Sequence, residues 1–402
     1  MINPKKLFLL VLLAVSSTTA VLAQKLTADI PAAYKNDTTY AFLDSTFGHR
    51  IPASIRVVGL GDVAYTAAEP VDFSKHMIQY LVEKKGFRTI LLPRNNWGMR
   101  RLNHYLTSNA ASNADIEVML VKEVTKNTIH NTREFAALLG WIKVYNLRHV
   151  NDPVILKGMN FFPPPTIIYL MSRYIMPHDS LRGIEMMKGW STKLRNDTFA
   201  LAQVQQWAAD KAAIHARQPW YQELTDDLEN IGNCKKWMLN ENMYNGQVFF
   251  DSCMARQAVA ATADEKKTII WGDNEMISRI KLHKQQEGKN FGLLLTDMQT
   301  PFYSILTDFS GKANIHLISE NKFGPAERSA GKASAAYLLK LKYPDNGGIL
   351  FPDDFTRLQV PPLFNIIDIY GQDVTYSTSD PIKPFDALVL FTSLTPTSFL
   401  NQ

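Results

Sequence analysis

Short apolar runs rich in β-branched residues recur along the chain, and stretches with helical spacing separate most of them. The runs lie at residues 55–60, 89–92, 154–157, 268–271, 291–295, 315–319 and 387–391. Between the first two, Phe73, Met77, Tyr80 and Leu81 have the spacing of one helical face. Strands that alternate with helices predict an α/β fold, with a mainly parallel sheet flanked by helices.

The strand pattern stops between about residues 166 and 262. Helical spacing, with many Trp, Met and Leu residues, covers 167–174, 199–215 and 221–238, and prolines at 163–165 and 219 punctuate the stretch. We therefore expect one α/β domain over residues 24–402 that carries a helical insertion or subdomain at about 166–262.

The amino terminus has the composition of a secretory signal. Lys5 and Lys6 precede an apolar run at 7–15, and Val21-Leu22-Ala23 supplies the small residues of a cleavage site. The alternative is an uncleaved anchor, but the run is shorter than the ~20 residues that span a bilayer. We expect a signal peptide over residues 1–23, no membrane span after its cleavage, and a periplasmic or secreted protein.

Cleavage would remove two lysines and no acidic residue, which lowers the formal net charge from +5 to +3. Such a near-neutral chain, without a basic stripe interleaved with aromatic residues, is not expected to bind nucleic acid. The only cysteines, Cys234 and Cys253, could form a bridge in an oxidising compartment or remain two buried free thiols.

Residues 57–64, VVGLGDVA, resemble the glycine-rich turn of a dinucleotide site. Such a site needs an acidic residue at the end of the next strand, where this chain has Leu92-Pro93-Arg94. Nucleophile-elbow, zinc-protease and Walker motifs are absent, and single histidines such as His130 fit surface or hydrogen-bonded residues better than metal ligands. No cofactor and no metal are predicted.

Residues 61–87 resemble a different motif, the G-E-[AS]-[TS]-H-G-x-x-E segment and following L-V-E-x-x-G-F helix of the erythromycin esterases. Further segments resemble that family in the same order, at 102–106, 134–146, 155–161, 251–257, 269–276 and 384–391. The resemblance implies an α/β fold with a helical insertion. It also implies ester hydrolysis by a Glu/His cluster at the carboxyl ends of the strands.

The chain departs from the family at the positions of the family's acidic and histidine residues. Asp62 replaces the family's Glu and Tyr65 its His, while Pro93 takes the place of an acid. Asn160 likewise stands for an acid, and Asp273 and Met276 stand where the family has histidines. Scaffold positions such as Gly61, Gly86, Trp141 and Trp271 fit the family. The interpretation is a retained fold whose family chemistry has been lost or replaced.

Three hypotheses remain. The leading one is an exported, non-hydrolytic protein that binds an unknown small molecule or protein partner in the ancestral pocket. The second is a carboxylic-ester hydrolase with a changed set, in which Asp62 or Asp273 is the base and Tyr65 and Arg94 stabilise an oxyanion. In the third, these four residues and Glu275 are ordinary polar groups around a filled cleft. The pocket candidates are Asp62, Tyr65, Glu69, Arg94, Asn160, Asp273, Asn274 and Glu275. If the family topology holds, Tyr65 and Asp273 should lie within ~10 Å of each other across one cavity.

Overall fold

The computed structural model describes residues 30–108, 118, 130–161, 164–192, 195–239, 243–262, 266–280, 289–300, 302–319, 322–343, 347–359, 363–367, 373–377 and 384–400. The predicted signal peptide lies outside these residues.

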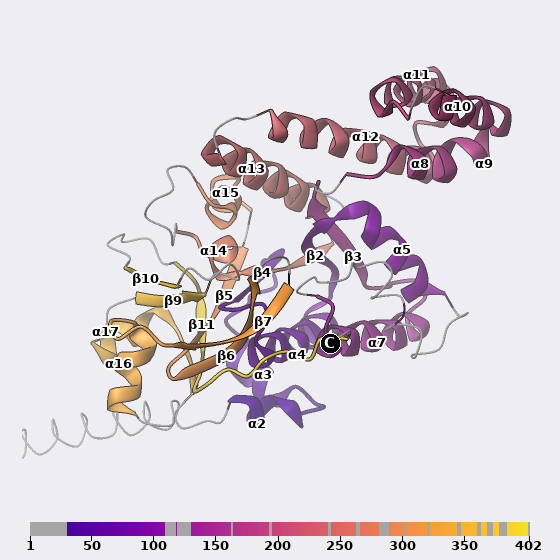
Figure 1. Ribbon diagram of the computed structural model, residues 1–402. Helices are drawn as coiled ribbons and strands as arrows, with labels where there is room; N and C mark the ends of the chain where they lie inside the picture. Colours follow the sequence, from indigo (N-terminus) through magenta and orange to yellow (C-terminus); the bar gives the residue numbers. More distant parts are fainter. Residues whose placement is uncertain are drawn as a thin grey trace, which may run out of the picture.

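A seven-stranded sheet with the order β3-β2-β4-β1-β5-β11-β8 forms the centre of the protein (Figure 1). Its strands are β1 (Val57–Asp62), β2 (Phe87–Asn95), β3 (Ile155–Asn160), β4 (Lys267–Asp273), β5 (Phe302–Phe309), β8 (Gly348–Leu350) and β11 (Ala387–Phe391). All neighbouring pairs are parallel except β11 with β8. The predicted mainly parallel α/β fold is therefore confirmed.

Two of the predicted strands have a different outcome. Residues 291–295 belong to the helix α15 (Phe291–Asp297), because the side chain of Asn290 caps its first turn by accepting from the amide of Leu293 at 3.1 Å. Residues 315–319 do form a strand, but in the antiparallel hairpin of β6 (Lys312–Ser319) and β7 (Lys322–Ser329), outside the main sheet. A second antiparallel pair joins β9 (Leu363–Ile367) to β10 (Asp373–Ser377).

Helices cover both faces of the sheet. Successive residues of a strand point to opposite faces, and here they enter two different apolar clusters. Val58, Leu60 and Ile269 belong to one apolar cluster, whereas Val57 and Ile270 belong to the other. The first cluster is covered by α2 (Ile30–Lys35), α3 (Ala41–Phe47), α4 (Ala68–Lys85), α5 (Asn96–Thr107) and α7 (Arg133–Arg148). The second is covered by α13 (Met243–Thr262), α14 (Asn274–Ile277), α15, α16 (Ala335–Lys342) and α17 (Pro352–Leu358).

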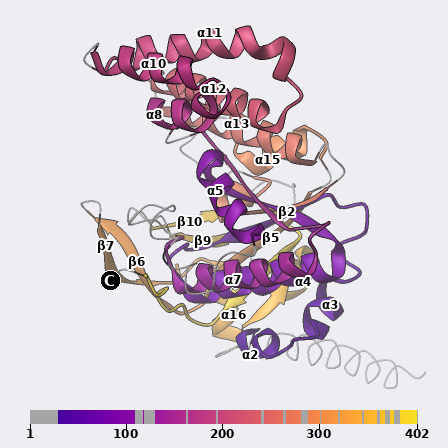
Figure 2. The same ribbon diagram turned by 90° about the vertical axis from the view of Figure 1, so that its right-hand side faces the viewer.

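Most of the described residues between β3 and β4 are helical, as expected. They form α8 (Ile167–Leu170), a π-helical turn (Met171–Ile175), α9 (Met176–His178), α10 (Ser180–Thr192), α11 (Asp197–His215), α12 (Pro219–Met238) and α13. Helices α8, α10, α11 and α12, together with the π-helical turn, have an apolar core of their own. Figures 1 and 2 place α10, α11 and α12 on the side of the molecule away from α2 and α3.

The two cysteines are free thiols. Cys234 on α12 and Cys253 on α13 are both buried and pack with Phe161 in one small apolar cluster. A search of the described part of the chain found no helix with the length and hydropathy of a membrane span.

Gly59 and Gly61 serve close packing. Residues 57–64 resemble a glycine-rich turn, but both glycines lie within β1 and form no turn. A Cβ on Gly59 would lie 2.6 Å from the ring of Phe302, and one on Gly61 would lie 2.8 Å from Oδ1 of Asn274. The glycines let β5 and α14 approach the middle of β1.

Gly59→Ala is therefore expected to lower the free energy of unfolding by about 1–3 kcal/mol, the cost of overfilling a packed core. Gly232→Ala is the matched control, because a Cβ at this position on α12 meets no atom within 4 Å. The control should be neutral or slightly stabilising, since alanine favours a helix over glycine. Urea denaturation of both variants measures the difference, and equal effects would contradict the packing argument.

Candidate active site

The carboxyl ends of β1, β2 and β4 meet at one edge of the sheet, here called the carboxyl edge. Asp62 ends β1 and lies beside Asp273, which ends β4, in the strand register. The connections that leave β1 and β4 pack on opposite faces of the sheet, through α4 and α14. Ligands of open α/β sheets bind at such an edge.

Asp62 is fully enclosed at this edge, with 1% of its surface exposed. Its carboxylate accepts hydrogen bonds from Nε1 of Trp271 at 2.8 Å and from the hydroxyl of Ser74 at 3.2 Å. Burial raises the pKa of Asp62 to about 7, and the Asp273 carboxylate also raises it, while the bonds from Trp271 and Ser74 act in the other direction.

Tyr65 and Asp273 meet directly, although 208 residues separate them. The hydroxyl of Tyr65 lies 3.4 Å from Oδ2 of Asp273, a long hydrogen bond in which the phenol is the donor. The other carboxylate oxygen of Asp273 accepts from the amide of Met276 at 2.6 Å and caps α14. The predicted closeness of Tyr65 and Asp273 is confirmed, and the cavity between them stays a prediction.

Pro93 changes the course of β2 at the carboxyl edge. The register of β2 against β3 shifts between Leu92 and Asn95, as expected where a proline cannot donate to the ladder. The guanidinium of the next residue, Arg94, binds Nδ1 of His130 through Nε at 3.1 Å and through a terminal nitrogen at 2.9 Å.

His130 comes from the segment before α7 and was not among the predicted site residues. It is 4% exposed, and its ring centre lies 6.3 Å from that of Tyr65 and 6.0 Å from that of Trp271. A single histidine carries no local sequence signal for such a position. Arg94 was a predicted pocket residue, but its sequence context gives no sign of its imidazole partner.

The electrostatics of the cluster fix where its protons lie. Burial, followed by the charges of Asp273 and Asp62, raises the pKa of Tyr65 well above its ordinary value, so the phenol stays protonated. Burial and then the Arg94 charge hold the pKa of His130 well below its usual range. Burial lowers the pKa of Arg94 to about 10, which leaves it cationic at neutral pH. Because Arg94 can only donate, Nδ1 of His130 is the acceptor and the imidazole is neutral.

The remaining candidate residues have other partners. The carboxylate of Glu69, on α4, accepts from the amide of Thr395 at 2.8 Å and from its hydroxyl at 2.6 Å. The side chain of Asn274 bridges to β5 through both backbone groups of Thr307, at 2.7 and 3.2 Å. Asn160 ends β3 opposite Asn95, and the backbone carbonyl of Glu275 accepts from Asn290 at 2.6 Å.

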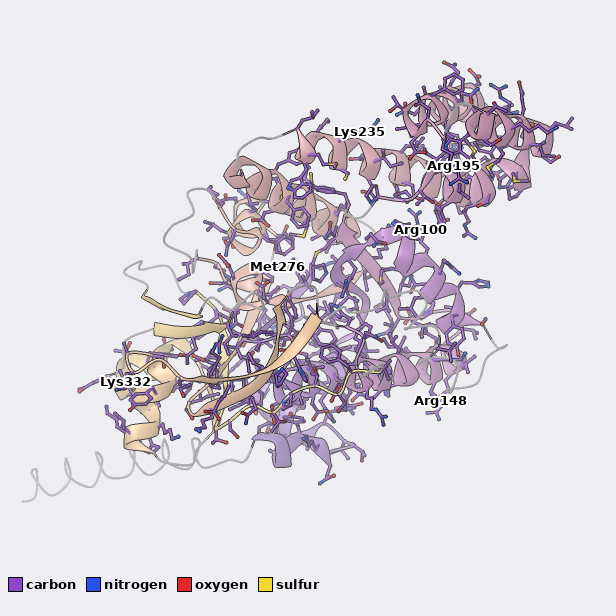
Figure 3. All side chains as sticks on the ribbon, viewed as in Figure 1. Arg100, Arg148, Arg195, Lys235, Met276 and Lys332 are labelled. Carbon is purple, nitrogen blue, oxygen red and sulfur yellow. The ribbon has the colours of Figure 1, made fainter. Side chains whose placement is uncertain are left out.

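The structure thus brings Asp62, Tyr65, Arg94 and Asp273 together and adds His130 and Trp271. Figure 3 labels Met276, on α14 beside this edge. Among the described residues, no group of three or more His, Cys, Asp and Glu side chains is arranged to hold a metal ion.

Three solved structures share this fold. A succinoglycan biosynthesis protein has a TM-score of 0.70 at 17% identity, covering 90% of this chain and 92% of its own. A Bacillus cereus protein has a TM-score of 0.68 at 18% identity, with 90% and 93% covered. A mutant of the erythromycin esterase EreC, in its open conformation, has a TM-score of 0.62 at 16% identity, with 89% and 96% covered.

Searches against family models and curated proteins found no match. The chain is therefore an α/β protein similar in fold to the erythromycin esterase and to the two other solved structures.

Proposed function

We propose that this chain is an exported, non-hydrolytic protein with an erythromycin-esterase-like fold, and that its carboxyl edge binds a small molecule or a protein partner. The signal-like residues 1–23 support export. The connections that leave the neighbouring strands β1 and β4 pack on opposite faces of the sheet, and ligands of open α/β sheets bind where such connections diverge. The resemblance to the esterases implies a water-activating imidazole at the position that Tyr65 occupies.

The observation that carries the proposal is that the polar groups of this edge bind one another. The Tyr65 hydroxyl donates to Asp273, and both Asp62 oxygens accept bonds from Trp271 and Ser74. Asp62 is also enclosed, with 1% of its surface exposed, whereas a general base must come within hydrogen-bond reach of the proton that it removes. The imidazole present, that of His130, has Nδ1 turned to Arg94, so this nitrogen cannot take a proton from water while the pair holds.

A second function is favoured by one property of Asp62. Its pKa of about 7 is the value expected of a carboxyl base that works at neutral pH. In that alternative, Asp62 or Asp273 activates water, and Tyr65 and Arg94 stabilise the oxyanion of a carboxylic ester.

The purified mature protein is expected to leave erythromycin and p-nitrophenyl acetate intact beyond the buffer rate. A positioned base contributes typically 10²–10⁴-fold, so its loss removes useful turnover. Steady-state kinetics on the wild type, Asp62→Asn and Asp273→Asn measure this. Asp210→Asn, on the exposed face of α11, is the matched carboxylate control. Turnover that survives in the control and vanishes in either site variant would refute the non-hydrolytic proposal and establish the alternative.

A further inference from the structure

A cleft lies at the edge of the sheet opposite the carboxyl edge, where the parallel strands begin. It has a volume of about 450 Å³, and its lining includes Gly48, His49, Ile51, Lys84, Lys85 and Lys267. Lys267 is the first residue of β4, and Lys84 and Lys85 end α4 just before β2. The cleft is therefore separate from the group around Asp62 and Asp273, which lies where the same strands end.

The lysines of this cleft are held by neutral groups. Nζ of Lys85 donates to the carbonyl of Gly48 at 2.6 Å and to that of Ile51 at 3.5 Å. Nζ of Lys267 donates to the carbonyl of Lys85 at 3.2 Å and lies 5.5 Å from the ring centre of Phe87. Carbonyl groups orient an ammonium without neutralising it, and each ammonium has three N–H donors. Lys267 therefore keeps donors that can serve a ligand.

The lining of the cleft carries three lysines and no carboxylate, with the Asp44 carboxylate close by at Gly48. Within the described ranges of the chain, no carboxylate forms an ion pair with Lys84, Lys85 or Lys267, and none belongs to the lining. Burial, then the charges of Lys85 and Arg56, lower the pKa of Lys267. The side chain of Asp44, which lies near Gly48, accepts a hydrogen bond from Tyr80 at 3.0 Å.

The helix dipole accounts for part of this arrangement. Lys84 and Lys85 stand in the last turn of α4, where the carboxyl end of a helix favours cations. Lys267 comes from β4, but its Nζ donates to the carbonyl of Lys85, the last residue of α4, so all three lysines lie at the carboxyl end of this helix. A bound anion would stabilise all three charges at once.

We propose that this cleft binds a phosphate group, carried by a small phosphomonoester or present as the free ion. Ammonium groups bind phosphate as point charges with several donors, and the volume leaves room for an organic group beside the phosphate. This site would act independently of the carboxyl edge.

The test is calorimetric titration of the full mature chain with inorganic phosphate and with glycerol phosphate at neutral pH, with ionic strength held constant by sodium chloride. One saturable site is expected for at least one probe, and the probe with the lower Kd identifies the free ion or the ester as the ligand. Lys267→Met should weaken Kd about tenfold or more, as expected for loss of a charge-assisted hydrogen bond. Lys84→Glu, a change at an exposed side chain, should weaken it as well and carries the test if Lys267→Met fails to fold.

Lys235→Met is the control. Lys235 is an exposed lysine on α12, in the helical part of the molecule away from α3 and α4 (Figure 3). This control should bind as the wild type does. Absence of saturable binding by either probe, an unchanged Kd in Lys267→Met and Lys84→Glu, or an equal loss in Lys235→Met would overturn the proposal.

Discussion

Arg100→Met is expected to lower the free energy of unfolding by about 3–5 kcal/mol, the cost of leaving a buried charge without its partner. Arg100 lies on α5, at the side that faces the helices between β3 and β4 (Figure 3). Its guanidinium lies 2.8 Å from the carboxylate of Asp227 on α12 and donates to the hydroxyl of Tyr174 at 2.9 Å. Asp227 has no exposed surface, so water cannot replace the lost partner.

A double variant distinguishes the cost of the unpaired charge from other effects of the Arg100 substitution. In Arg100→Met with Asp227→Asn, the orphaned charge is gone and Tyr174 can still donate to the side-chain oxygen, so most of the stability should return. Arg173→Met is the matched control, because Arg173 is half exposed and its contact with Glu223 is 3.4 Å. The control should cost less than about 1 kcal/mol. Equal losses from Arg100→Met and Arg173→Met in urea denaturation would show that the buried pair does not hold these helices to α5.

The predictable part of the fold is the part in which composition and burial agree. Residues 57–62 and 267–273 form strands that are buried along most of their length, and their β-branched residues predict these strands. β5 was missed, although it is buried throughout, because Ser304 and Thr307 interrupt its apolar run. Their hydroxyls donate to the carbonyls of Ile277 and Gly61, at 3.0 and 2.9 Å. Such long-range partners satisfy buried polar groups but leave no trace in the local sequence.

The site divides in the same way. The resemblance to the esterases placed Tyr65 beside Asp273. No local pattern predicts this contact, since Tyr65 follows β1 and Asp273 ends β4. His130 was not predicted, because its burial depends on contacts with Phe135 and Trp271, which belong to other elements. The glycines of β1 were correctly treated as special, but the reason is close packing of Phe302 and Asn274 and not a turn.

Asp62→Asn is expected to gain stability relative to the wild type as the pH rises from about 4 to about 7, by on the order of 4 kcal/mol in total. Burial raises the pKa of Asp62 from 3.8 to about 7, so the folded wild type holds a proton that the unfolded chain has already released. Its stability contribution is greatest below pH 4 and is lost as the pH rises through 7. The asparagine variant cannot lose a proton, so the difference between the two proteins should change over this window and be constant outside it.

Asp308 gives an independent copy of the same test. It lies near the end of β5, where the side chain of Asn365 donates to it at 2.8 Å, and burial raises its pKa to about 7 as well. Asp308→Asn should therefore show the same pH window, whereas Asp210→Asn, an exposed substitution, should show little change. Taking each difference against the wild type cancels His130, whose lowered pKa makes the folded protein less stable as the pH falls through 6.5.

The result for Asp62 bears on chemistry as well as on stability. A carboxyl group with a pKa of about 7 is largely protonated in acid and about half ionised at neutral pH, so hydrolysis through Asp62 would fall off as the pH drops below 7. Urea denaturation at several pH values between 4 and 8 measures the differences. If Asp62→Asn and the wild type differ by a constant amount across that range while Asp308→Asn shows the window, then Asp62 is ionised in the folded protein. The group that the esterase resemblance makes catalytic would then be available as a base.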